Sequence, residues 1–547
     1  MKIPSDLKSR EAFVRDLIEK CQVSISNRKA DYSNLRSYYL FGAGAEDSPA
    51  QFNKIFPTID QLISFLYAGD TTRFTIHLGA TAPKTEYEKI NVLTNYLNDK
   101  WFDTGGDKTF LSSLTWALAM CCTHVKLVWQ DGINPYVVMP GCMGVLREDV
   151  PSLDGQEAIS HSYYITKSEL YRRLYAHPRR EEIVKRLESA QHAPEYIPAG
   201  VDRIILSATD PNITGNVNLD LYGFNRMKAE VAEDTIEMHE LWVWDTDAAD
   251  YRCVTMADPD VMIYDRLSGP DPEGKKGNKG IYIKGEHPFH QVCPNPQVDY
   301  YWGQSEVQRL VLLQQLRNTR LAQISKLLEL QLNPPFFLSG MSGIPDEKAF
   351  SLDMPGSSMS NDMPNAKVDR LGPTMPEDVF REVQQIDQMF AEASGINAIL
   401  TGQGEEGVRS QGHAAQLARL ASARTKKRAL VIEDALAKVA THYLKLLTLH
   451  DPTHFKDEKG ISFTLDQFTK DHIVKVDAHS NSPIFMEDTR QLAFELFKAQ
   501  AIDKESLLDL LDPPMKQLLK RRLQKTEEAQ PNAGQPRVIE GGKRGGQ

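Results

Sequence analysis

The chain has 547 residues, of which 41% are hydrophobic and 25% are charged, and its formal net charge is −11 at pH 7. This composition fits a folded, multi-domain protein, and the acidic charge excludes one that grips nucleic acid along its whole surface. No apolar run reaches the roughly 18–20 residues that span a bilayer. Residues 1–20 are too charged for a signal peptide, so we expect no membrane partner and synthesis in the cytosol. The six cysteines lack CxxC spacing, which indicates buried thiols in a reducing compartment.

The first three hundred residues alternate between helical and strand-like patterns. Apolar residues at helical spacing predict helices over 8–29, 50–67, 84–101, 108–122 and 168–187. Strand patterns cover residues 73–78, 124–129, 136–139, 235–245, 251–256, 261–267 and 281–284. The turn signal Gln130-Asp131-Gly132 joins two of these strands in a predicted hairpin. We therefore predict an α+β fold class, with residues 1–302 forming one mixed body.

The middle of the chain predicts unusually long helices. A first helix over 303–333 carries apolar residues on more than one stripe, so we expect it to be buried on two sides. A turn-rich insert, 334–373, precedes a second helix, 374–395, which begins at the capping box Thr374-x-x-Glu377 and ends at Gly395. A glycine-rich loop, 396–411, leads into a third helix over 412–451. Helices of this length must bury apolar faces, either in a large bundle or against neighbouring copies of the chain.

The end of the chain is expected to hold two short strands and amphipathic helices over 452–524. Residues 525–547 are polar and lack periodicity, which predicts a disordered tail.

Motifs for catalysis are weak, and we expect neither an enzyme nor a bound cofactor or metal. Residues 269–276 nearly match a phosphate-binding P-loop, but Lys276 replaces the required Ser or Thr and strand-like residues follow, so a hairpin tip is favoured. Asp245, Asp247 and Asp250 could bind a cation, yet aspartates between two strands are typical of turns. His287 and His290 are interpreted as a satisfied loop pair rather than a ligand pair.

Two further features each allow two interpretations. The basic residues of the third helix form either a solvated face or a surface that meets DNA or a neighbour: Arg419, Arg424, Lys426, Lys427 and Arg428. The loop at 402–407 can move because glycine permits many backbone states, and it is either a plain linker or a functional loop.

An ordered set of short motifs resembles the portal protein of tailed bacteriophages, which is the head-to-tail connector. The residues that carry the resemblance are Trp302-Gly303-Gln304-Ser305-Glu306-Val307, Gln314 and Gln315, Gly395-Ile396-Asn397, and Gly407-Val408-Arg409-Ser410-Gln411-Gly412. The resemblance covers roughly residues 52–523. The order of the motifs, rather than any single motif, carries it.

The resemblance implies a division of the chain into a wing, a two-helix stem, a clip, a tunnel loop, a long wing helix and a C-terminal crown-like region. The wing would be 1–302, the stem helices 303–333 and 374–395, the clip 334–373, the tunnel loop 396–411, and the long wing helix 412–451. The C-terminal wing or crown region would be 452–524. The implied clip residues include Phe336, Phe337, Ser351 and Asn365. The implied tunnel-loop residues are Gly402, Gly404, Glu405, Glu406, Gly407 and Arg409.

The implied function is a ring of twelve copies at one capsid vertex that conducts double-stranded DNA during packaging and ejection. Its partners would be the terminase large subunit, a tail adaptor, the major capsid protein and the scaffold. The protein would then lie in the virion, and in the host cytoplasm during assembly. From the width of the apolar surface we expect Leu310, Leu321 and Leu328 to pack partly against a neighbouring subunit. The alternative is a helical scaffold or minor capsid protein without a DNA channel, and a nucleotide-dependent motor comes third.

Overall fold

The computed structural model describes most of the body and part of the remainder of the chain. The described residues are 1–44, 52–67, 74–78, 84–129, 132–189, 235–257, 261–270, 282–339, 358–361, 367–370, 378–395, 423–451, 453–456, 462–465, 472–476, 492–511 and 522. The fold is α+β, as predicted. None of the described helices combines the length and the apolar character that a bilayer span requires.

A five-stranded antiparallel sheet, in the order β4-β5-β6-β7-β8, forms one part of the body. Its strands are β4 Met143–Val145, β5 Ala158–Thr166, β6 Thr235–Asp245, β7 Asp250–Ala257 and β8 Val261–Leu267. Alternate residues of β6 point to opposite faces, as a pleated strand requires. Leu241 and Val243 pack against helix α1, whereas Ile236 and Met238 pack against α5 and α6. The helices are α1 Leu7–Phe41, α5 Lys167–Arg173 and α6 Arg180–Ser189.

A second antiparallel sheet has the strand order β3-β2-β9. Its strands are β2 Thr123–Trp129, β3 Ile133–Val138 and β9 Phe289–Val292. Helices α4 Gly106–Met120 and α11 Ala423–His450 pack against it. The largest apolar core lies here and also includes residues of α2 Ile55–Leu66 and α3 Lys84–Asp103.

Smaller elements account for much of the rest of the described chain, which also includes helical residues 492–498. They are β1 Phe74–Leu78 paired with β15 His472–Val476, β13 His454–Lys456 paired with β14 Ser462–Thr464, the 3-10 turns η2 Pro140–Cys142 and η3 Leu153–Gly155, and helix α13 Lys504–Leu511.

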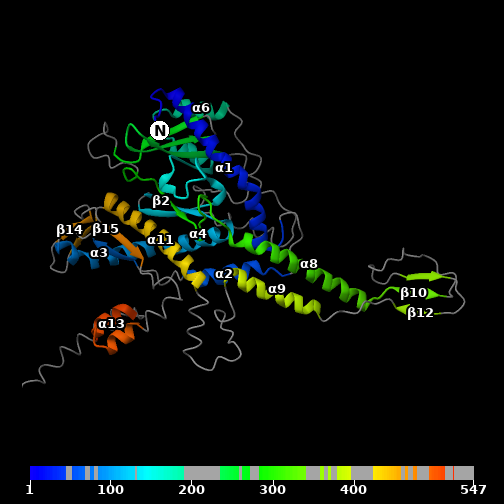
Figure 1. Ribbon diagram of the computed structural model, residues 1–547. Coiled ribbons are helices and arrows are strands. Elements are labelled where there is room, and N and C mark those ends of the chain that lie inside the picture. The colour runs from blue at the N-terminus through cyan, green and yellow to red at the C-terminus, as the bar shows by residue number, and fades with distance from the viewer. Residues whose placement is uncertain are drawn as a thin grey trace, which may run out of the picture.

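Two long helices project from the body side by side and carry a small sheet at their far end (Figure 1). They are α8 Glu306–Leu332 and α9 Asp378–Ser394. The small sheet has the order β11-β10-β12, with β10 Phe336–Ser339, β11 Ser358–Asn361 and β12 Lys367–Arg370. Strand β10 pairs in parallel with β11 and antiparallel with β12. We call α8, α9 and this sheet the arm.

The arm agrees with the predicted helices and adds strands that were not predicted. Ser305 caps α8 and Asn333 ends it, and Gly395 follows α9 with φ of 78°. The insert was expected only to be rich in turns, yet it contains the three strands β10, β11 and β12. We call the small sheet that they form the tip sheet. The predicted capping box at 374–377 lies outside the described residues.

Three predictions within the body were wrong in their boundaries. Helix α1 continues to Phe41 rather than stopping near residue 29, because Leu35, Tyr38 and Tyr39 are buried in the core. The single helix predicted over 168–187 is two helices, because Pro178 cannot continue an α-helix. Residues 282–284 form no strand; Tyr282 instead donates its N–H to the Ser268 carbonyl at 2.8 Å and enters the core.

Candidate functional site

The connection between β9 and α8 is fixed by buried aromatic residues. The Tyr301 hydroxyl lies 2.6 Å from His124 Nε2, and the two rings stack. The Trp302 indole N–H donates to Glu148 Oε1 at 3.0 Å. The Arg28 guanidinium lies 3.7 Å from the centroid of the Trp302 ring and pairs with Glu148. A desolvated cation over an indole face contributes about 2 kcal/mol, so this connection is rigid.

Two small residues then set the start of α8. Gly303 has φ of 68°, and a Cβ there would lie 2.4 Å from Cys293 Sγ, so a larger residue would be strained and would collide. Ser305 Oγ accepts the N–H of Gln308 at 3.3 Å and donates to the Ala119 carbonyl at 2.6 Å. The N-cap therefore also attaches α8 to α4.

The first half of α8 is held by side-chain amides. Gln314 is fully buried; its Oε1 accepts the Lys54 N–H at 3.0 Å and its Nε2 donates to the Phe52 carbonyl at 3.1 Å. Gln315 Nε2 donates to the Tyr38 hydroxyl at 2.6 Å. These two glutamines, noted in the sequence only for their resemblance, attach α8 to α1 and α2.

Ion pairs join α8 to α9. Arg317 Nε lies 3.1 Å from Asp387 Oδ1, and its guanidinium lies 4.8 Å from the centroid of the Phe52 ring. One turn further out, Arg320 Nε lies 2.8 Å from Glu382 Oε1. Because the partner moves backward along α9 as α8 advances, the helices are antiparallel.

A buried arginine of α11 joins the ends of three helices. Arg428 Nη2 lies 2.6 Å from Glu306 Oε1, in the first turn of α8. Its Nη1 donates to the carbonyl of Ser394, the last residue of α9, at 3.2 Å, and its Nε donates to Asn295 Oδ1 at 3.1 Å. Glu306 also pairs with Arg309, which is one-third exposed. We call Arg428, Glu306, Asn295 and Ser394 the helix junction.

The helix junction corrects both interpretations for one of the basic residues of α11, Arg428. Arg428 is 7% exposed, so it belongs neither to a solvated face nor to a surface open to DNA. Lys426 is half-buried and Lys427 is exposed, while Arg419 and the side chain of Arg424 lie outside the described residues. The sequence did hold a signal, because Arg428 stands four residues before Ile432, on the apolar stripe that continues to Leu436, Val439 and Tyr443.

The three leucines expected at a subunit interface differ in exposure. Leu310 is 1% exposed and belongs to the main core of its own chain, so the expectation that it meets a neighbour was wrong. Leu321 is half-buried and Leu328 is 44% exposed, so both keep surface that another chain could cover. Phe336 and Phe337 open strand β10 of the tip sheet.

The remaining predicted site residues lie outside the described part of the chain. They are Ser351, Asn365, Gly402, Gly404, Glu405, Glu406, Gly407 and Arg409. The described ends around the predicted tunnel loop are Gly395, beside the helix junction, and Ala423, which begins α11.

The two neighbouring histidines are not a loop pair. His287 is buried, its pKa is lowered to about 4 by burial, and its Nδ1 finds no partner among the described residues. His290 lies in β9, 3.1 Å from His442 Nδ1 through its own Nε2. His442 and Lys445 pair with Glu286. Burial alone would raise the pKa of Glu286, but hydrogen bonds and charge interactions with His442 and Lys445 outweigh burial and lower that pKa to about 2.

The aspartates between β6 and β7 shape turns, as the favoured interpretation expected. Asp245 Oδ1 accepts the N–H of Asp247 at 3.0 Å. Asp250 accepts the N–H groups of Gly269 and Gly285 at 2.8 and 2.7 Å, so it joins the first residue of the segment that resembled a P-loop to Gly285. Within the described residues, no group of three or more His, Cys, Asp or Glu side chains could hold a metal ion.

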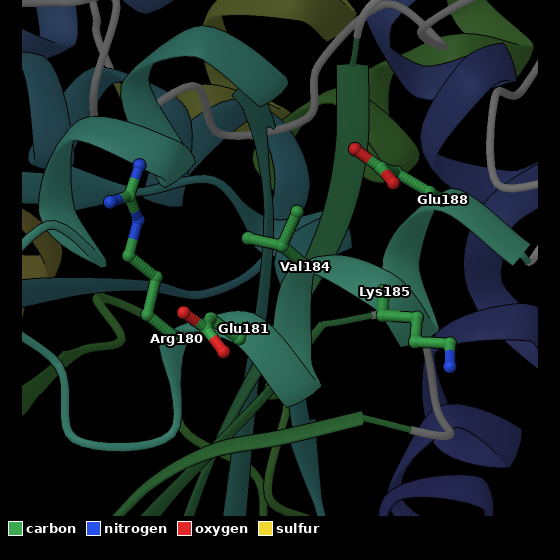
Figure 2. A pocket seen from close by; sticks show the side chains of 5 residues that line it. All are labelled: Arg180, Glu181, Val184, Lys185 and Glu188. Atoms are coloured by element: carbon green, nitrogen blue, oxygen red, sulfur yellow. The ribbon is translucent and has the colours of Figure 1, made fainter.

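A hollow on the surface of α6 offers no second candidate. Figure 2 shows its lining side chains, Arg180, Glu181, Val184, Lys185 and Glu188, which all come from that one helix. Because no second element contributes a lining group, nothing there could hold a ligand from two sides.

Comparison with known proteins gives distant structural similarity only. No family model matches the chain, and no curated protein matches it. A chain of the virion of a native gene transfer agent particle aligns with a TM-score of 0.39 and 10% sequence identity, covering 91% of this chain and 99% of that chain. A chain of the neck of an empty gene transfer agent particle aligns with a TM-score of 0.40 and 12% identity, covering 90% of this chain and 94% of that chain. At such scores these similarities establish neither a family nor a function.

Proposed function

We propose that this chain is the ring-forming subunit of a portal at one vertex of a tailed-bacteriophage capsid, where it conducts double-stranded DNA. The observation that carries the proposal is the arm, an antiparallel helical pair that leaves an α+β body and ends in a separate small sheet. The order of the sequence motifs agrees with this arrangement, since those resembling residues that the structure describes lie at the start of α8, on its inner half and directly after α9.

The apolar surface of the arm supports assembly into a ring. Side chains on both helices are exposed in the single chain, including Leu312 at 75%, Leu332 at 80% and Phe380 at 51%. Such residues along two helices are typical of an interaction surface. A head-to-tail contact between identical copies closes into a ring when its rotation closes, so neighbouring arms would cover these side chains.

Electron microscopy of the purified full-length protein tests the proposal. We expect rings with a central pore; a monomer, or an assembly without a pore, would contradict it and favour the scaffold or minor capsid alternative. In the matched variants, Leu328→Asp should lose most of the rings, because an unpaired buried charge costs several kcal/mol. Gln323→Asp, at an exposed polar position of the same helix, should keep them.

We assign DNA contact to the predicted tunnel loop, residues 396–411, which follow Gly395 in the sequence. Glu405 and Glu406 would repel phosphate and let DNA slide. Changing both to Lys would add salt-dependent phosphate contacts in every subunit. We expect intact rings whose particles package or eject DNA slowly in low salt and recover in higher salt, and wild-type rates in low salt would remove the loop from the DNA path.

We assign docking of the terminase large subunit and the tail adaptor to residues 334–373, which include the tip sheet. The tip lies at the end of the arm farthest from the body (Figure 1), where a partner could reach it without disturbing the core. Replacing residues 351–365 with a Gly-Ser linker should leave rings intact and abolish terminase binding in a pull-down, and retained binding would contradict this assignment.

A further inference from the structure

Cys122 and Cys293 are neighbours across two strands. Thr123 pairs with Val292 in the antiparallel ladder of β2 and β9, so Cys122 and Cys293 stand opposite each other one step beyond that pair. Opposite residues of an antiparallel ladder have Cα atoms about 4.5 or 5.5 Å apart, and their side chains point to the same face. A disulfide requires about 4.4–6.8 Å between Cα atoms, so the backbone already satisfies its main requirement.

The two thiols also interact. The Cys122 thiol lies within hydrogen-bond reach of the Cys293 side chain. Room for the Cys293 sulfur comes from Gly303, where any side chain would collide with it at 2.4 Å. All six cysteines of the chain are free thiols in this structure. We propose that Cys122 and Cys293 are a redox pair, which closes to a disulfide when the protein meets an oxidising low-molecular-weight disulfide.

The environment of the two sulfurs sets the order of the reaction. Cys293 is half-buried and therefore reachable from solvent, whereas Cys122 is fully buried. Burial raises the pKa of the Cys122 thiol well above its usual range, so it remains protonated until a neighbouring sulfur is activated. The thiolate of Cys293 would attack the small disulfide, forming a mixed disulfide and releasing one small thiolate. Cys122 would then attack the Cys293 sulfur; the second small thiol leaves with the Cys122 proton, and two electrons pass from the pair to the small disulfide.

The bond would act on the base of the arm. It would join the start of β2 to the residues that follow β9, which lead through Trp302 and Gly303 into α8. It would also close a long chain loop that contains the entire five-stranded sheet, and closing a long loop stabilises the folded state mainly by restricting the unfolded one. In the reducing cytosol the pair would stay open, so the bond would form only after the protein leaves it.

Peptide mapping of the full-length protein after incubation with oxidised or reduced glutathione tests the pair. We expect a mass loss of about 2 Da in the oxidised sample, one cross-linked peptide that contains Cys122 and Cys293, and a thermal midpoint several degrees higher that dithiothreitol reverses. Cys293→Ser should lose all three effects while keeping its circular dichroism spectrum.

The matched control is Cys121→Ser, at the residue next to Cys122, which should keep all three effects. A cross-link between Cys121 and Cys293, or an oxidised wild-type sample in which Cys293 is still alkylated by iodoacetamide, would overturn the proposal. No variant of the fully buried Cys122 is needed for this test. The wild-type peptide map and Cys293→Ser decide the question even if Cys122→Ala does not fold.

Discussion

The inner and outer halves of α8 are held by different kinds of contact. The inner half is fixed by buried groups of its own chain, from the Ser305 cap through Gln314 to Arg317. The outer half buries Ile324 and Leu330, makes the half-exposed pair Arg320–Glu382, and leaves Leu328 and Leu332 facing solvent. This difference shows that contacts within a single chain determine where the arm begins and in which direction it extends from the body. The outer half, by contrast, still has surface for a partner.

The largest expected effect is a loss of stability at low pH that arises in the body and not in the arm. Residues 303–395 contain no histidine, whereas the body buries several whose pKa is lowered by loss of solvation, including His124 to about 3 and His239 to about 4. A lowered pKa means that the unfolded chain binds more protons below about pH 6.5, so stability rises with pH. Stability should therefore be lost progressively as pH falls from about 6.5 towards 4, by about 1.4 kcal/mol per pH unit for each such histidine.

Denaturant titrations at several pH values would measure this loss. His239→Gln should reduce the slope of unfolding free energy against pH by about 1.4 kcal/mol per unit. His77→Gln, at an exposed position, should leave the slope unchanged. Equal slopes in both variants would contradict the assignment of acid sensitivity to the buried histidines.

The second largest effect should come from the helix junction. Arg428→Met leaves Glu306 buried and paired with Arg309, which is one-third exposed, and breaking a buried ion pair costs about 3–5 kcal/mol. The free energy of unfolding from chemical denaturation measures it. Arg309→Met removes the exposed partner of the same carboxylate and should cost about 0–1 kcal/mol. Equal losses in the two variants would show that burial does not decide the role of Arg428.

The smallest effect compares two arginines one turn apart on α8. Arg317 contacts both Asp387 and the Phe52 ring and is mostly buried, whereas Arg320 has one main partner and is one-third exposed. We expect Arg317→Met to cost about 1–3 kcal/mol and Arg320→Met less than about 1 kcal/mol. The same titrations would check both, and a larger loss for Arg320→Met would reverse the distinction between inner and outer halves.

Local signals in the sequence were enough to predict much of this fold. The end of the first arm helix at residue 333, the stop at Gly395 and the pairing of β2 with β3 depend on neighbours in the chain, so they could be predicted without a structure. The α+β class followed from the same periodicities. The strands of the tip sheet were missed because each described strand has only four residues, too few for alternation to be recognised.

The helix junction could not be predicted because its members are far apart in the sequence. Arg428 belongs to a run of basic residues that predicts an exposed face, and only the fold places Glu306 and the Ser394 carbonyl beside it. His290 and His442 likewise meet only because α11 lies across β9. The position of Arg428 on an apolar stripe indicates that it is buried, but it does not indicate which carboxylate Arg428 contacts.

Because α8 leads almost directly into the tip sheet, a small rotation at the base of α8 moves the tip sheet by a larger distance. Only residues 333–335 separate the end of α8 from the start of β10, and the helix is about 40 Å long at 1.5 Å per residue. Each degree of tilt at its base therefore displaces its end by about 0.7 Å. A small rearrangement around Trp302 and Gly303 would thus be magnified into a displacement of several ångströms at the tip, and a push on the tip would return to the body as a torque on the same few residues.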